Sequence, residues 1–323
     1  MKRLFIFALL GIVLLGCKTE IKNSEAKIEI EKGTEIENSR TDEESQTQVS
    51  EESGNEDSKL DDPLLGFWVG YFEKDDEDYE KNIYVDEGYY WNRENKINIS
   101  IDVVKDSLVF GHSVVAGNDR PFQGVIIQEN ETYLFRVREP GDDKYDGEFV
   151  FSIENGSLQG KWTAYHNIEI KNRKYNLEKK YFRYDPNISL EQSKEYVNWY
   201  EFVETNEEVE IDYDEFEEWI SREFASATDL IYKINASNTV LTKNEVENLK
   251  KGDLTIIRNT IYARHGYSFK NRPLRVFFDA QSWYIPVHTN IKDDFTKLEI
   301  NNIKLLLKYE KNASEYYDYF GRG

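Results

Sequence analysis

A period-two alternation of apolar and polar residues over positions 64–184 constrains the fold of this 323-residue chain more than any other feature. Successive side chains of a β-strand point to opposite faces, so the alternation predicts strands with one buried face. Around Asn155-Gly156, the positions that share one face are Phe149, Phe151, Ile153, Leu158, Gly160 and Trp162. Asn-Gly tolerates the positive φ angles of a tight turn, so this stretch predicts an antiparallel hairpin.

Two further segments alternate in the same way, and turn residues separate them from their neighbours. Their apolar positions are Ile97, Ile99, Ile101 and Val103 in one segment and Tyr133, Phe135 and Val137 in the other. Pro140-Gly141-Asp142-Asp143 and Glu129-Asn130-Glu131 mark turns. Short strands joined by tight turns are typical of antiparallel barrels and sandwiches, so we predict a β-barrel-like domain over residues 63–185.

The start of this domain, Gly66-Phe67-Trp68, resembles the Gly-x-Trp opening of lipocalin-type barrels. The resemblance implies that Trp68 closes one end of the barrel and that an internal cavity holds an apolar ligand. The alternative is a small barrel filled by its own side chains. An aromatic content of 14% favours that alternative, because many of these rings fall on inward positions.

The N-terminus carries the pattern of a secretory signal. Lys2 and Arg3 precede an apolar run over residues 4–15, and Gly16 precedes Cys17. The run is shorter than the roughly 20 residues that a membrane-spanning helix needs. The pattern resembles the bacterial lipoprotein signal, which implies that residues 1–16 are removed and that Cys17 is acylated. An ordinary signal peptide is the alternative.

Acylation of Cys17 would leave the chain without a thiol, because Cys17 is its only cysteine. We therefore expect no disulfide, no cysteine-based zinc site and no cysteine nucleophile. The lipid would hold the protein on a membrane of the bacterial envelope. Lys18, which follows the cysteine, favours the outer membrane if the organism is Gram-negative.

Residues 17–62 are rich in Glu, Ser, Asn, Thr and Lys and contain no aromatic residue. Such a segment buries too little apolar surface to offset the entropy of ordering, so we predict a disordered acidic tether. A helix through Ile28-Glu29-Ile30-Glu31 is the alternative. The formal net charge of the whole chain is −21, which argues against nucleic acid as a partner. Residues 243–311 hold more Lys and Arg than Asp and Glu, and this asymmetry indicates a separate unit.

Residues 186–238 are predicted to form a helical connector. Ser189 can cap a first helix, and two apolar stripes have the spacing of three and four residues that is typical of helices. The stripes are Tyr196, Trp199, Tyr200 and Val203, then Phe216, Trp219, Ile220 and Phe224.

The C-terminal part predicts further short helices. Thr242 and Glu245, like Thr296 and Glu299, have the spacing of a capping box, so a helix should begin at each. The first should stop at Gly252, where Asp253 can cap the next helix. The apolar face of that next helix is Leu254, Ile257 and Ile261, and Gly266 supplies its left-handed stop. The last helix should present Leu298, Ile303, Leu306 and Leu307.

The string Arg258-Asn259-Thr260-Ile261-Tyr262-Ala263-Arg264-His265-Gly266-Tyr267-Ser268-Phe269 resembles the signature of the YARHG domain. The resemblance continues through Trp283-Tyr284-Ile285-Pro286 and Glu299-Ile300-Asn301-Asn302-Ile303. It implies a small α-helical module over residues 239–312, followed by a tail at 313–323. Such modules end exported bacterial proteins, often lipoproteins, and the resemblance implies no established reaction. Thr260 stands where we expect an acidic residue.

The candidate binding or structural motif comprises Arg258, Tyr262, Arg264, His265, Gly266, Trp283 and Tyr284. In one interpretation, Arg264 and His265 line a cleft for an anionic glycan or peptide, since guanidinium binds carboxylate. In the other, which we favour, both side chains tie the helix end to neighbouring carbonyls and carboxylates.

No other pattern indicates catalysis or metal binding. The histidines His112, His166, His265 and His288 lack a metal-ligand spacing, and the acidic clusters at 75–78 and 212–217 lack the order of an EF-hand. We expect no catalytic residue, no metal and no cofactor. The α+β chain is thus predicted to be a lipid-anchored envelope protein with a binding or scaffolding role, whose partners besides the membrane would be the cell wall or proteins. The alternatives are an envelope enzyme with a site between its domains and a carrier of an apolar ligand.

Overall fold

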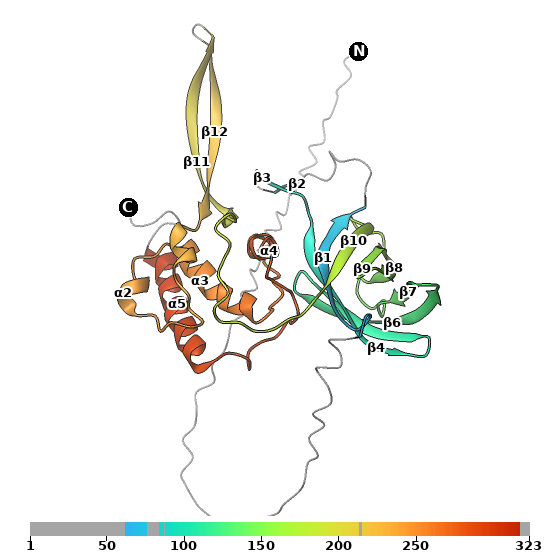
Figure 1. The fold of residues 1–323 in the computed structure, drawn as a ribbon. Coiled ribbons are helices and arrows are strands. Elements are labelled where there is room, and N and C mark those ends of the chain that lie inside the picture. Colours follow the sequence, from blue (N-terminus) through green and yellow to red (C-terminus); the bar gives the residue numbers. More distant parts are fainter. Residues whose placement is uncertain (1–61, 76–83, 87, 213–214, 317–323) are drawn as a thin grey trace, which may run out of the picture. The chain divides into compact units, whose positions relative to one another are not determined.

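A computed structural model describes residues 62–75, 84–86, 88–212 and 215–316 (Figure 1). The predicted signal peptide, Cys17 and the tether before Asp62 lie outside the described residues. The same holds for the predicted tail from residue 317 onward.

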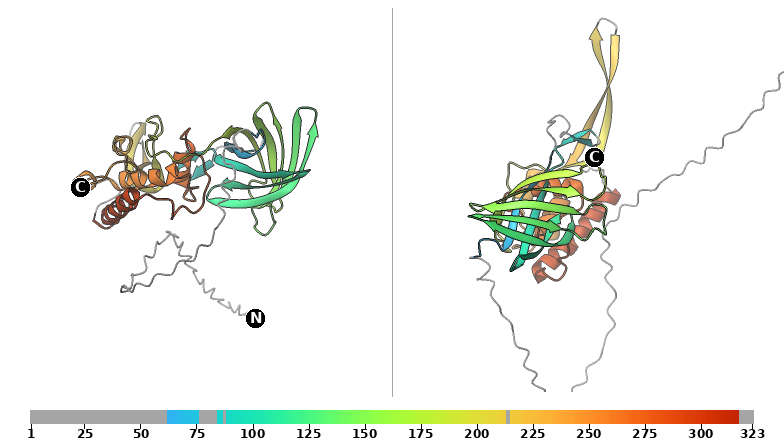
Figure 2. Two further views of the ribbon diagram at one scale, coloured as in Figure 1. Left: turned by 60° about the horizontal axis from the view of Figure 1, so that its bottom comes forward. Right: turned by 90° about the vertical axis from the view of Figure 1, so that its right-hand side faces the viewer.

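Eight strands of the described residues close into an antiparallel barrel in which each strand pairs with its neighbours and β1 pairs with both β4 and β10 (Figures 1 and 2). The strands are β1 (Gly66–Lys74), β4 (Asn95–Lys105), β5 (Leu108–Val115), β6 (Asn118–Glu129), β7 (Thr132–Arg138), β8 (Gly147–Glu154), β9 (Ser157–Ala164) and β10 (Asn172–Lys180). A small hairpin of β2 (Tyr84–Asp86) and β3 (Tyr89–Trp91) is inserted between β1 and β4. The predicted antiparallel barrel is confirmed.

The strand register also follows the alternation in the sequence. Asn155 and Gly156 both have positive φ, at 50° and 75°, as the predicted hairpin turn requires. Trp162 is 4% exposed, whereas the side chain of its neighbour Lys161 is 68% exposed. Trp68 is fully buried and its Nε1 donates to the Leu64 carbonyl at 2.9 Å.

Aromatic rings occupy the interior of the barrel. They belong to one buried cluster: Phe72, Phe122, Phe135, Phe149, Phe151, Trp162 and Tyr175. The Phe135 and Phe151 rings stack at 4.6 Å, and the Phe72 and Trp162 rings meet edge to face at 5.6 Å. An apolar ligand would have to displace these rings, so the packing favours a barrel filled by its own side chains.

The prediction of a helical connector is wrong. Strands β11 (Val197–Asp212) and β12 (Glu215–Ser226) form a long antiparallel hairpin, which Figure 1 shows as a two-stranded ribbon. A short 3-10 helix, η2 (Asp229–Tyr232), follows.

Aromatic residues of this segment pack across strands instead of along one helix face. The Phe202 and Phe224 rings meet at 6.1 Å, and Trp199 stacks on Tyr89 of β3 at 4.4 Å. Trp199 is buried while the adjacent Tyr200 is 45% exposed, which is the period of a strand. Short apolar stripes cannot separate helix from strand by spacing alone, and here the preference of Tyr, Trp, Phe and Val for strands prevails.

In the described residues of the C-terminal part there are four α-helices: α2 (Lys243–Val246), α3 (Lys251–Arg264), α4 (Arg272–Asp279) and α5 (Lys297–Tyr316). Both predicted capping boxes are present, since Glu245 accepts from Thr242 and Glu299 accepts from Thr296. The expected stop at Gly252 is wrong, because Gly252 lies inside α3. Asp253 is instead the third residue of that helix and accepts from the backbone of Lys250 and Thr228.

The loop after α4 packs on the outer face of β1 and β4. Val69 forms a small apolar cluster with Ile285 and Val287. The Lys96 ammonium donates to the carbonyls of Gln281 at 2.6 Å and Tyr284 at 3.1 Å, which joins the barrel to the helical part through buried polar groups. Burial lowers the pKa of Lys96 to about 8.

Within the described residues, no helix combines the length and apolar character that crossing a membrane requires.

The register gives a direct prediction. Trp162→Ala removes a ring from the barrel core and should lower the free energy of unfolding by about 3–5 kcal/mol. Lys161→Ala, one position away on the outer face, should lower it by about 0.5 kcal/mol or less. Chemical denaturation of both variants tests the difference, and equal losses would contradict the register.

Candidate functional site

A cavity of about 530 Å³ lies where the chain leaving β10 passes the C-terminal end of α3. One wall is the segment 181–188, a second is the last turn of α3, and a third is the loop after α4. The lining residues are Tyr181, Phe182, Arg183, Tyr184, Asp185, Pro186, Ile188, Ala263, Arg264, Trp283 and Ile285. Four of them, Ala263, Arg264, Trp283 and Ile285, belong to the YARHG-like strings of the sequence.

Arg264 is 5% exposed and reaches from α3 to the opposite wall. Its Nε and Nη2 donate to the Ile188 carbonyl at 3.0 and 2.7 Å, and its Nη1 donates to Ser237 Oγ at 3.1 Å. No carboxylate of the described residues lies within ion-pair distance of this guanidinium. Burial therefore lowers the pKa of Arg264 to about 10, and Glu299 and Asp185 offset only part of the effect.

His265 lies behind the cavity wall and joins three segments of the chain. Its Nε2 is 3.0 Å from Glu299 Oε2 at the start of α5. The Tyr184 ring stacks on the imidazole at 4.2 Å, and the Tyr184 hydroxyl donates to Glu299 Oε1 at 2.9 Å. Arg264 binds a carbonyl and His265 faces a carboxylate, as in the interpretation that these side chains tie the helix end to its neighbours. Three of the residues they contact, Ile188, Ser237 and Tyr184, lie outside the predicted module.

Glu299 is the centre of this cluster and has no exposed surface. Burial, the largest influence, raises the pKa of Glu299. Hydrogen bonds from His265, the Thr296 backbone and Ser237, together with the charge of His265, overcome it and lower the pKa to about 2. Burial and the bond to Glu299 raise the pKa of Tyr184 to about 12. The carboxylate is thus the stable form of Glu299 inside the fold.

Gly266 ends α3 with a φ of 70°, as predicted. A Cβ at this position would lie 2.9 Å from the Phe182 ring and 3.2 Å from Val287 Cβ. Glycine is therefore needed twice, for the left-handed turn and for the close approach of the segment that lines the cavity.

The other predicted residues do not line the cavity. Arg258 forms a two-pronged ion pair with Glu310, at 2.8 and 3.0 Å, and so joins α3 to α5. The Tyr262 ring packs edge to face against Phe295 at 5.0 Å. Tyr284 is buried, donates through its hydroxyl to the Tyr267 carbonyl at 2.7 Å, and shares a core cluster with Leu254, Ile257 and Ile261.

Three cavity features were not predicted. Arg183 has no hydrogen-bond or ion-pair partner among the described residues, and Trp283 Nε1 is buried with no acceptor there. Tyr184 links the wall to Glu299. The alternation of apolar and polar residues ends after the last strand, at Tyr181-Phe182-Arg183-Tyr184. This aromatic run was the sequence signal from which an aromatic cavity wall could have been predicted.

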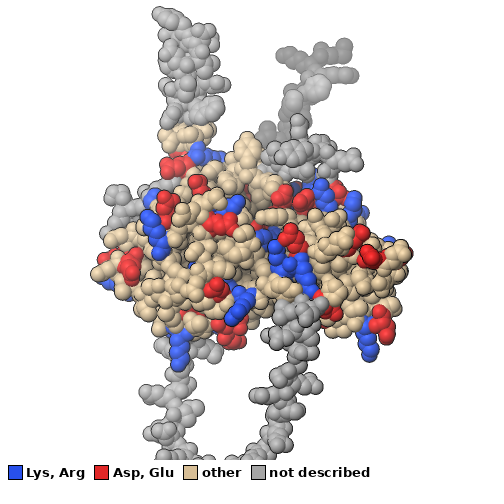
Figure 3. Space-filling view, in the orientation of Figure 1, with Lys and Arg blue, Asp and Glu red and all other residues tan. Residues whose placement is uncertain are grey.

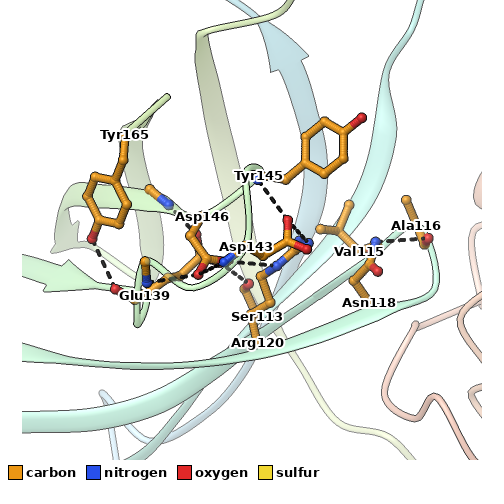
Figure 4. A network of polar contacts seen from close by, with 12 residues as sticks. Ser113, Val115, Ala116, Asn118, Arg120, Glu139, Asp143, Tyr145, Asp146 and Tyr165 are labelled. Atoms are coloured by element: carbon orange, nitrogen blue, oxygen red, sulfur yellow. Dashed lines mark hydrogen bonds and ion pairs between the residues drawn. The ribbon is translucent and has the colours of Figure 1, made fainter. Parts of the chain in front are cut away.

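A second polar cluster lies around the loop between β7 and β8 (Figure 4). Glu139 accepts from Gly147 N at 2.7 Å, Trp162 Nε1 at 3.1 Å and Ser113 Oγ at 3.1 Å. Burial raises the pKa of Glu139 to about 7, against those bonds. In Figure 4, Arg120 points toward Asp143 and Asp146, with which it forms ion pairs of 3.2 and 3.0 Å.

The other strongly shifted carboxyl belongs to Asp279, whose pKa burial raises to about 7. It is 6% exposed and accepts from the Lys96 backbone at 2.8 Å. Neither Glu139 nor Asp279 lines the cavity beside α3. No group of three or more His, Cys, Asp or Glu in the described part of the chain is placed to hold a metal ion.

On the face shown in Figure 3, Lys and Arg side chains lie among Asp and Glu side chains.

Glu299 gives a pH-dependent prediction. A carboxyl whose pKa is lower in the folded than in the unfolded state stabilises the fold above the unfolded value, and this is lost as the pH falls through the folded value. The difference between about 4.5 and about 2 corresponds to roughly 3 kcal/mol at neutral pH. Glu299→Gln should remove this contribution. Between pH 5 and 2, the free energy of unfolding of the variant should therefore fall less than that of the wild type, and the difference should be on the order of those 3 kcal/mol.

Glu245→Gln is the matched control, because Glu245 occupies the same capping-box position in α2 but is exposed. It should lower stability much less. Denaturation curves at several pH values test both variants, and an unchanged pH dependence in Glu299→Gln would contradict the role given to this carboxylate.

Comparison with known proteins identifies the C-terminal part of the chain. Residues 229–311 match the family profile of the YARHG domain, which begins before the predicted boundary at residue 239 and includes η2. No curated protein and no solved structure matched the chain. The chain therefore contains a YARHG domain that follows an eight-stranded antiparallel barrel.

Proposed function

We propose that this protein is an exported, lipid-anchored envelope protein that binds a ligand in the cavity beside the YARHG motif and catalyses no reaction. The observation that carries the proposal is the cavity itself, because it joins ligand-sized volume to unused hydrogen-bond donors. Pockets of about 300–1,000 Å³ with apolar walls and a few polar groups are typical of small-molecule sites. This cavity has about 530 Å³ and is lined by four aromatic residues and two arginines.

A non-catalytic role is supported by the position of the titratable groups. An acid or base needs a pKa near the working pH and access to the substrate. The two carboxyls with such values, Glu139 and Asp279, do not line the cavity beside α3, and Glu139 lines a separate cavity of about 450 Å³ on the barrel. His265 lies behind the wall and faces Glu299, so its ring holds the fold together.

The proposed location depends on Cys17. The Leu14-Leu15-Gly16-Cys17 string supports cleavage before Cys17 and acylation of its thiol. The following residues, up to the first strand at Gly66, would hold the barrel and the YARHG domain away from the membrane surface.

The anchor has a simple test. Mass spectrometry of protein extracted from membranes should find an N-terminal Cys17 that carries lipid. Cys17→Ser should leave the membrane fraction. A free Cys17 thiol in the wild type, or a membrane-bound Cys17→Ser variant, would contradict lipid anchoring.

The cavity has a separate test. The protein is dialysed against a soluble digest of bacterial envelope, and mass spectrometry identifies the small molecules that it retains. Ile188→Trp places a larger side chain at the cavity wall and should abolish retention. Ile127→Trp, at an exposed position of β6, is the matched control and should retain the same molecules.

Thermal unfolding of both variants shows whether the fold survives the substitution. Retention by folded Ile188→Trp, or no retention by the wild type, would contradict the proposal.

A further inference from the structure

We propose that the cavity beside the YARHG motif binds a sugar ring that carries one carboxylate. The proposal rests on the proposed function, since it names the ligand class of the same site.

Arg264 requires an anion more than any other residue of the wall. A buried cation is costly unless a charge of opposite sign compensates it. Arg264 is 5% exposed, yet the described residues offer it only one carbonyl and one hydroxyl as direct acceptors. A guanidinium has five N–H groups, and these bonds use three of them. The remaining two can donate to a ligand at the cavity wall.

A second cation lines the same space. Arg183 lies at the cavity wall and has no partner among the residues that the structure describes. Arginine pairs with carboxylates through two parallel bonds, which suits a carboxylate between these side chains.

The charge of the lining favours one negative charge over two. Two arginines stand against one acidic residue, Asp185. A single carboxylate matches this balance, whereas a doubly charged phosphate would be repelled by Asp185 at close range. Asp185 also supplies a carboxylate at the wall, and hydroxyl groups of a ligand can donate hydrogen bonds to it.

The walls favour a ring with polar edges. Tyr181, Phe182, Tyr184 and Trp283 present aromatic surface, against which the C–H faces of a sugar ring can pack. A lipid chain would bury the same rings but leave Arg183 and the two remaining N–H groups of Arg264 without partners. The combination of flat apolar walls with several donors and one acceptor therefore fits an acidic sugar.

Two probes that differ in one group test the proposal. N-acetylmuramic acid carries a lactyl carboxylate that N-acetylglucosamine lacks, and the rest of the two rings is the same. Isothermal titration of the full-length protein should show at least tenfold tighter binding of the acidic sugar. That difference should shrink as the salt concentration rises, because salt screens the charge of the exposed Arg183.

Arg183→Gln removes one cation without breaking a bond to any described residue, so the fold should be retained. Its affinity for N-acetylmuramic acid should fall about fivefold or more, with little change for N-acetylglucosamine. Arg136→Gln is the matched control, because Arg136 is an exposed arginine on β7 that lies outside the cavity, and it should bind both sugars as the wild type does.

Equal affinity for the two sugars, or an unchanged affinity in Arg183→Gln, would overturn the carboxylate preference. Tighter binding of N-acetylglucosamine 1-phosphate would overturn the single charge, and tighter binding of benzoate would overturn the sugar ring. If neither sugar binds while the envelope digest still leaves a retained molecule, this inference fails and the proposed function stands. If the wild type retains nothing, the proposed function fails as well.

Discussion

The carboxylate of Glu299 is the point on which the C-terminal half of the structure depends. It is buried, and it is held by Thr296 of its own capping box, by His265 at the end of α3 and by Tyr184 from the segment after β10. A buried charge is tolerated only where several donors surround it, and losing one leaves the rest uncompensated. Three segments that are separated in sequence therefore contact the same carboxylate, and these contacts fix the position of the cavity walls.

The barrel supplies the frame for those walls. β10 ends at Lys180, and the next residues line the cavity, so the direction of the last strand sets where Phe182 and Tyr184 lie. Phe182 fills the space that Gly266 leaves, and the loop after α4 covers Val69 on the outside of β1. Lys96 adds hydrogen bonds to this contact, because its ammonium donates to two carbonyls of that loop. The barrel and the YARHG domain are thus linked through buried surface, and a ligand at the cavity would contact both sides of that link.

The sequence predicted the elements whose signal is local. The Asn155-Gly156 turn, the alternation around Phe149 and Trp162, both capping boxes and the left-handed Gly266 all follow from rules within a few residues. The hairpin of β11 and β12 was missed, because its apolar residues have spacings that fit a helix as well, and only pairing across strands decides. The site was predicted in part for a similar reason. Arg264 and Trp283 stand in a recognisable string, whereas Arg183 and Tyr184 join them only through the tertiary path of the chain.

The two interpretations of Arg264, structural and ligand-binding, are compatible within one side chain. The bonds to the Ile188 carbonyl and Ser237 fix the guanidinium plane, so the side chain has already lost its rotational freedom before any ligand arrives. A ligand that pairs with a fixed guanidinium loses less free energy to ordering than one that must immobilise a mobile arginine. The same contacts that stabilise the end of α3 would therefore prepare the cavity for the proposed ligand. Gly266 and Glu299 would act on that binding through the position of the wall and not through contact with the ligand.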